Sequence, residues 1–131
     1  MANYKQFDII WTHFPLSDKI DKLKLRPALI VSNKFSNGLD NDVMVCPITS
    51  RIRGDEFAII LIDAMVSIPL DTESELRCNK ITNIRNSLFS DKIGELLPEY
   101  HDKILEKIKS AFDNFSIDLS EKSIKAKHID S

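Results

Sequence analysis

The chain has 131 residues, of which 43% are hydrophobic and 29% charged, and its formal net charge is −2. This length predicts one domain that buries its own core without disulfides or a structural metal. The small negative charge argues against a protein that coats nucleic acid through charge alone. No signal peptide and no membrane-spanning apolar run is evident, so we expect a cytoplasmic protein.

Apolar and β-branched runs predict five strands, which we place at residues 6–14, 27–33, 42–50, 57–62 and 76–84. Pro27 has no N–H to donate within a ladder, so it belongs at the first residue of its strand or at an edge. Pro47 predicts a bulge or an edge in the third strand for the same reason. The continuous apolar run of the fourth strand predicts burial on both faces.

The segments between these strands read as loops. Residues 15–25 are polar and rich in lysine, which predicts a mobile loop. Residues 33–41 are a cluster of turn residues, residues 51–56 form a charged turn around a glycine, and residues 63–75 are irregular.

The pattern changes after the fifth strand. Residues 92–96 suggest a short turn or helix, and Pro98 fits the first turn of a helix that runs to about Phe115. An apolar stripe at helical spacing is expected to pack on the sheet. Its members are Ile104, Ile108, Ala111, Phe112 and Phe115. We expect residues 1–115 to form the domain and residues 116–131 to be a polar extension that frays or forms a short appended helix.

Sequential strands closed by a C-terminal helix predict a mainly β fold of the α+β class. The expected architecture is a small, strongly bent antiparallel sheet or partial barrel. Cys46 and Cys78 lie within apolar runs and are expected to be buried, reduced thiols. The sequence has no cysteine pair at zinc-like spacing, and its three scattered histidines do not predict a metal site.

Three places could carry chemistry. Arg26 lies beside Pro27 at a strand, and its planar guanidinium suits a phosphate or a carboxylate. Thr49 and Ser50 put two hydroxyls at the end of the third strand, where they can donate to an anionic oxygen, although threonine is also common in strands for packing reasons. His13 is the one conventional general base of the three, although a lone histidine is more often a packed or surface residue.

Basic residues gather in three clusters at predicted strand ends. They are Lys19, Lys22, Lys24 and Arg26, then Arg51 and Arg53, then Arg77, Lys80 and Arg85. A fold that joins these clusters would form a basic groove on a mildly acidic protein, whereas separate clusters would be solvated loop charge.

Five segments in order resemble the PemK/MazF family of toxins from type II toxin–antitoxin systems. They are Asp8-Ile9-Ile10-Trp11, Arg26-Pro27-Ala28-Leu29-Ile30-Val31-Ser32, Pro47-Ile48-Thr49-Ser50, the Arg77 to Ile81 stretch and Lys92-Ile93-Gly94-Glu95-Leu96. The resemblance implies a CcdB/MazF-type, SH3-like barrel and a homodimer. It also implies a metal-independent endoribonuclease that cuts single-stranded mRNA at short sequences and needs no cofactor. An antitoxin would cover the same groove, and the complex would bind operator DNA through the antitoxin.

Family catalysis maps onto Arg26 and Thr49, with His13 as a possible general base. The candidate RNA-binding residues are Lys24, Ser50, Arg51, Arg77 and Lys80. RNA supplies its own 2′-hydroxyl nucleophile, so we expect 2′,3′-cyclic phosphate and 5′-hydroxyl ends. A gyrase poison of the same fold, or a member that only binds its partner or nucleic acid, is the alternative.

The chain departs from the family pattern at several points. The usual Gly-Ser-Glu-Gln loop is replaced by residues 17–22, Phe7 stands in place of a glycine, and Lys80 stands where many members have glutamine. The chain also ends without the Trp-Gly-Ile element of the gyrase poisons.

Overall fold

A computed structural model describes residues 4–16 and 19–114. It contains seven strands, two α-helices and three short 3₁₀ turns in this part of the chain. The strands are β1 (Asp8–Leu16), β2 (Lys19–Ile30), β3 (Asp42–Thr49), β4 (Ala58–Leu61), β5 (Ser74–Arg77), β6 (Thr82–Arg85) and β7 (Phe89–Glu95). The helices are α1 (Lys34–Asn37) and α2 (His101–Ser110), and the 3₁₀ turns cover Asp63–Met65, Asn86–Leu88 and Pro98–Tyr100.

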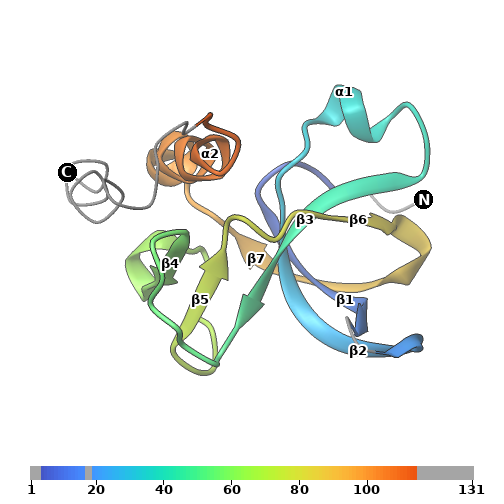
Figure 1. Ribbon diagram of the computed structural model, residues 1–131, viewed down its shortest axis with the longest axis horizontal. Helices are drawn as coiled ribbons and strands as arrows, with labels where there is room; N and C mark the ends of the chain where they lie inside the picture. The colour runs from blue at the N-terminus through green and yellow to red at the C-terminus, as the bar shows by residue number, and fades with distance from the viewer. Residues whose placement is uncertain (1–3, 17–18, 115–131) are drawn as a thin grey trace.

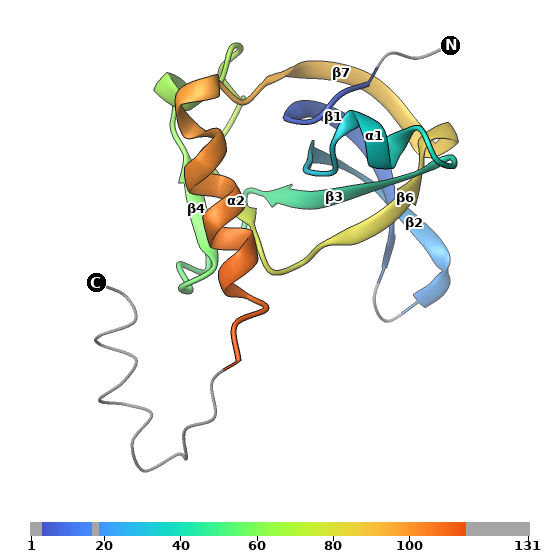
Figure 2. The same cartoon turned by 90° about the horizontal axis from the view of Figure 1, so that it is seen from above.

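The strands form one bent antiparallel sheet in the order β4-β5-β3-β2-β1-β7, and β6 also pairs with β3 (Figure 1). The expected mainly β fold with a C-terminal helix is confirmed. Helix α2 lies beside β4 in both views (Figures 1 and 2) and buries Ile104 and Ile108 in the core. No helix in the described residues is long and apolar enough to cross a membrane.

Both faces of the central strands are covered by apolar side chains. Ile9 and Leu29 belong to the core cluster that includes α2, whereas Ile10 and Ile30 belong to a second cluster. Successive residues of a strand point to opposite faces, so the clusters lie on opposite sides of β1 and β2. The burial on both faces that was predicted for residues 57–62 is therefore found in β1 and β2 instead. In β4 the fully buried side chains alternate, because this strand lies at the edge of the sheet.

The predicted loop at residues 15–25 is wrong for its described part. Strand β2 begins at Lys19 and continues the hairpin, pairing Leu23 with Pro15 and Leu25 with His13. Leucines alternate with lysines here, which is a strand pattern that the high lysine content concealed. Residues 17–18 lie outside the described residues.

Three further expectations need correction. The predicted fifth strand is two strands, β5 and β6, because each pairs with a different part of β3. Residues 92–96 belong mostly to β7, whose pairing with β1 overrides their local turn preference. Helix α2 ends at Ser110, so Ala111 and Phe112 are exposed and do not extend the buried stripe. Phe115 and residues 116–131 lie outside the described residues.

The two prolines act at points where pairing changes. Strand β3 pairs with β6 up to Val45 and with β5 from Ile48, so Pro47 stands between two partners on that edge. Pro27 lies in the interior of β2, next to Ala28, where the described pairing with β3 begins. Both prolines lie in inner strands of the sheet, each where the pairing on one side is interrupted, so the expected edge is not found and the expected start of a strand at Pro27 is wrong.

Candidate functional site

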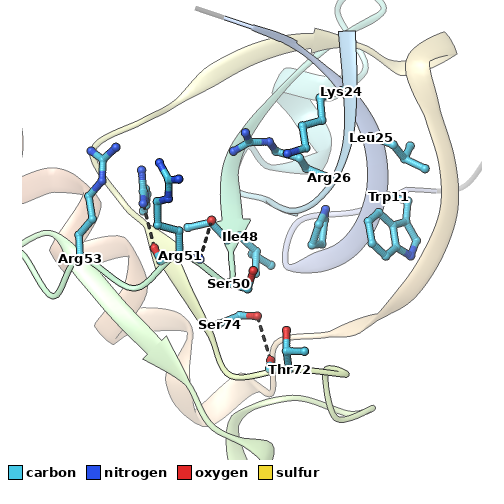
Figure 3. A pocket seen from close by; sticks show the side chains of 13 residues that line it. Trp11, Lys24, Leu25, Arg26, Ile48, Ser50, Arg51, Arg53, Thr72 and Ser74 are labelled. Atoms are coloured by element: carbon cyan, nitrogen blue, oxygen red, sulfur yellow. Dashed lines mark hydrogen bonds between the residues drawn. The ribbon is translucent and has the colours of Figure 1, made fainter.

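A cavity of about 530 Å³ opens where β1, β2, β3 and β5 meet (Figure 3). Its lining residues are Trp11, Lys24, Leu25, Arg26, Pro27, Ile48, Thr49, Ser50, Arg51, Arg53, Thr72, Ser74 and Arg77. The lining includes five cationic and four hydroxyl side chains, and no carboxylate is among these lining residues. Such a surface suits an anion with several oxygen atoms, such as a phosphodiester.

Arg26 and Thr49 reach this cavity from neighbouring strands. The ladder between β2 and β3 ends at the pair Ala28 and Pro47; Arg26 lies two residues before Ala28 and Thr49 two residues after Pro47. Both residues are partly buried. The structure thus brings together the two residues that the sequence selects.

The hydroxyl of Thr49 has a defined orientation. Its Oγ1 accepts a hydrogen bond from the backbone N–H of Arg51 at 3.1 Å (Figure 3). Because that bond uses an oxygen lone pair, the hydroxyl proton stays free to be donated. Thr49 can therefore act as a donor to an anionic oxygen in the cavity.

The loop after β3 is held by a buried carboxylate. Glu75 of β5 has no exposed surface, and its Oε1 accepts from the backbone N–H groups of Arg53 at 3.0 Å and Gly54 at 3.2 Å. Its Oε2 accepts from Nε of Arg77 at 3.1 Å. Gly54 has φ +69°, a backbone conformation that glycine adopts without steric cost. Glu75 was not predicted from the sequence, where its signal was a carboxylate two positions before an arginine on one strand.

Hydrogen bonds to Glu75 and to the loop after β3 hold the side chain of Arg77 in place. Its side chain is 13% exposed, and its Nη2 donates to the carbonyl oxygen of Arg51 at 3.0 Å. The candidate RNA-binding residues Lys24, Ser50 and Arg51 are instead exposed at the cavity.

Two candidates lie outside the lining. His13 is exposed, and its Nδ1 donates to the carbonyl oxygen of Leu88 at 3.3 Å. Lys80 is exposed in the turn between β5 and β6.

Seven lining residues were not among the candidates, and four of these have polar or aromatic side chains: Trp11, Arg53, Thr72 and Ser74. Trp11 had a detectable signal, since it is the sole tryptophan and the strand pairing sets it against Pro27 beside Arg26. The places of Thr72 and Ser74 depend on how β5 approaches β3, for which the local sequence has no marker.

The ionisable groups with displaced pKa values lie away from this cavity. Burial raises the pKa of the Cys46 and Cys78 thiols to about 12 each, and both residues are free cysteines in the core. Lys92 and Lys5 lower the pKa of Glu95 through hydrogen bonds and charge. The same lysines bind the buried Asp8 at 3.2 and 2.8 Å, which ties β1 to β7. In the described residues, no group of three or more histidine, cysteine, aspartate or glutamate side chains is arranged to hold a metal ion.

Residues 5–112 match the family model described as PemK-like, MazF-like toxin of type II toxin–antitoxin system. The chain belongs to this family. The match spans the strands, the cavity and helix α2, so the family assignment covers the candidate site. No curated protein matches the sequence of this toxin.

Solved structures agree with the assignment. The Mycobacterium tuberculosis toxin MazF-mt6 is 27% identical and superposes with a TM-score of 0.62, over 81% of this chain and 98% of that chain. MazF from Deinococcus radiodurans is 18% identical with a TM-score of 0.69, over 86% and 98% of the chains. A mycobacterial endoribonuclease in complex with its cognate antitoxin is 21% identical with a TM-score of 0.67, over 84% and 95%. The last two likenesses concern the fold alone.

Proposed function

We propose that this toxin is an endoribonuclease that cuts single-stranded mRNA without a metal ion and thereby stops translation and growth. The observation that carries the proposal is that Arg26 and Thr49 line the same cavity, which has five cationic side chains. Family membership and the likeness to endoribonuclease toxins support the same activity.

In the proposed reaction the RNA supplies the nucleophile. The 2′-oxygen forms a bond to the adjacent phosphorus, the bond from phosphorus to the 5′-oxygen breaks, and the products are a 2′,3′-cyclic phosphate and a 5′-hydroxyl. Negative charge grows on the phosphoryl oxygens, where Arg26 donates two hydrogen bonds and Thr49 donates one. The leaving 5′-oxygen takes a proton from solvent.

Arg26 is not suited to be the general base because a guanidinium group keeps its proton in proteins. His13 has Nε2 available, since Nδ1 already donates to a carbonyl oxygen. It lies outside the cavity lining, however, so water most simply takes the 2′-proton. His13 pairs with Leu25, which lines one side of the cavity. His13 acts as the base only if the bound RNA places its 2′-hydroxyl on that side.

The rest of the cavity would bind the RNA strand. Lys24, Ser50, Arg51 and Arg53 are exposed and can bind consecutive phosphates. Trp11 has a partly exposed ring on which an unstacked base can stack. We further propose a cognate antitoxin that covers this cavity, which the complex of a mycobacterial endoribonuclease with its antitoxin supports. A homodimer in the cytoplasm, and operator DNA binding of the complex through the antitoxin, are part of the same proposal.

The decisive experiment is incubation of the purified full-length toxin with a long single-stranded RNA in the presence of EDTA. We expect discrete fragments with 2′,3′-cyclic phosphate ends, whose sequenced 5′ ends also give the cleavage motif. The Arg26→Ala variant should lose about 10²-fold or more in rate. The matched control is Arg85→Ala, which removes an exposed arginine of β6 outside the lining.

Three results would contradict the proposal. They are cleavage of the same strand as DNA, cleavage of RNA with 2′-deoxy nucleotides at the mapped sites, or full activity of Arg26→Ala. An intact RNA substrate together with inhibited gyrase supercoiling would instead identify a non-enzymatic poison.

A further inference from the structure

We infer that Glu75 is a positioning residue that sets the orientation of the Thr49 hydroxyl through the loop after β3. This inference rests on the proposed function for its catalytic consequence. Its structural part, a carboxylate that fixes the loop, stands independently of RNA cleavage. Glu75 neither lines the cavity nor reaches the proposed substrate, so it would act only through other residues.

Glu75 is fully buried. A carboxylate without exposed surface is costly unless its oxygens are hydrogen-bonded. Here two backbone N–H groups and one guanidinium N–H satisfy it. Bonds to a charged acceptor are stronger than neutral ones, so the acceptor and its donors hold one another in place.

A chain of three hydrogen bonds connects Glu75 to Thr49. The carboxylate fixes Arg77, Arg77 donates to the carbonyl oxygen of Arg51 at 3.0 Å, and the N–H of Arg51 donates to Oγ1 of Thr49 at 3.1 Å. Arg51 is therefore held on both its carbonyl and its amide side. Since the amide bond occupies a lone pair of Oγ1, it determines where the hydroxyl proton can point.

Glu75 also fixes the backbone of two cations that line the cavity, Arg51 and Arg53. Oε1 of Glu75 accepts from the backbone N–H groups of both Arg53 and Gly54. One buried group therefore fixes the backbone that carries Arg51 and Arg53. Loosening this loop would misplace the donor hydroxyl of Thr49 and two phosphate-binding side chains together. A small misplacement at a reacting centre lowers the rate by as much as about 10²-fold.

The test begins with the full-length protein and no RNA. Glu75→Gln keeps the shape of the side chain but replaces a charged acceptor with a neutral one and removes the acceptor for Arg77. We expect the amides of Arg53 and Gly54 to exchange hydrogen about tenfold faster than in the unmodified protein. Trypsin should also cut faster after Arg51 and Arg53. The matched control is Glu73→Gln, which removes an equal charge from an exposed residue two positions away.

The second arm measures RNA cleavage. Glu75→Gln should lower kcat by about tenfold or more relative to Glu73→Gln. In a Thr49→Ala background the same substitution should change kcat by less than about threefold, because its target hydroxyl is already absent. A general loss of stability would not depend on Thr49, so this difference separates positioning from a purely structural role.

Arg77→Lys is the second variant, for use if Glu75→Gln does not fold. It keeps the positive charge beside Glu75 but cannot donate from two nitrogen atoms, so faster trypsin cleavage after Arg51 is again expected. Unchanged amide exchange in Glu75→Gln overturns the inference. So does a kcat equal to that of Glu73→Gln, or an equal loss with and without Thr49. If the unmodified protein leaves RNA intact, the proposed function fails, and amide exchange and trypsin cleavage still decide whether Glu75 fixes the loop.

Discussion

The ring of Phe7 stacks on the ring of His101, with centroids 3.6 Å apart and planes inclined by 15°. Phe7 has φ +74°, the left-handed region that favours glycine. Its N–H donates to Ile30 and its carbonyl oxygen accepts from Leu96, so pairing on both sides fixes this conformation. The toxin therefore combines a backbone suited to glycine with a buried aromatic ring.

Phe7→Ala and Phe7→Gly separate these two effects. Both variants lose the ring, which costs about 3–5 kcal/mol for a buried phenylalanine. Alanine stays strained at positive φ whereas glycine does not, so Phe7→Gly should be more stable than Phe7→Ala by about 1 kcal/mol. Urea unfolding followed by circular dichroism measures the difference. The reverse order would show that the backbone at this position carries no strain.

Thr49 is expected to matter through its hydroxyl alone. Thr49→Val keeps the branched shape and should lower kcat for RNA cleavage by about 10²-fold, whereas Thr49→Ser should retain most of the activity. Thr82→Val is the control, because Thr82 lies on the neighbouring β6 and its hydroxyl bonds to the carbonyl oxygen of Lys80. Equal losses for the valine and serine variants of Thr49 would remove the hydroxyl from the mechanism.

Trp11 offers a direct measure of RNA binding, because it is the sole tryptophan and lines the cavity. Single-stranded RNA with 2′-O-methyl groups lacks the nucleophile, so it should bind without cleavage and change the tryptophan fluorescence. Lys24→Ala should reduce the dependence of log affinity on log salt by about 0.7, the value for one phosphate contact on a single strand. Lys80→Ala should leave this slope unchanged, since Lys80 lies outside the lining. A change in slope for Lys80→Ala would extend the RNA path beyond the cavity.

The buried thiols predict a loss of stability at high pH. Burial raises the pKa of Cys46 and Cys78 from 9.0 to about 12, so the folded protein keeps protons that the unfolded chain releases above pH 9. Their contribution is complete below pH 9 and is lost as pH rises toward 12. Urea unfolding under reducing conditions should show a loss of about 1 kcal/mol per thiol between pH 9 and 10. Replacing both cysteines with alanine should flatten this dependence, and an unchanged slope would refute the assignment.

Several parts of the fold were predictable because their signal is local. Strand β3 follows from its apolar run between turn residues, and helix α2 follows from Pro98 and the spacing of Ile104 and Ile108. The errors lie where pairing with a distant strand outweighs local preference. Residues 19–25 and 89–95 are strands because β1 pairs with both of them.

The sequence by itself determined the family and the two residues proposed for catalysis, because Arg26 and Thr49 occur in short segments that can be recognised without a structure. Only the tertiary structure decided which neighbours serve them. It brought Trp11 and Arg53 to the cavity and left His13 and Lys80 outside its lining. It also buried Glu75 beneath the loop after β3, because β5 pairs with the end of β3. A run of acidic residues looks alike in the sequence whether a carboxylate faces solvent or three donors. Two of the three hydrogen bonds of Glu75 come from residues more than twenty positions away.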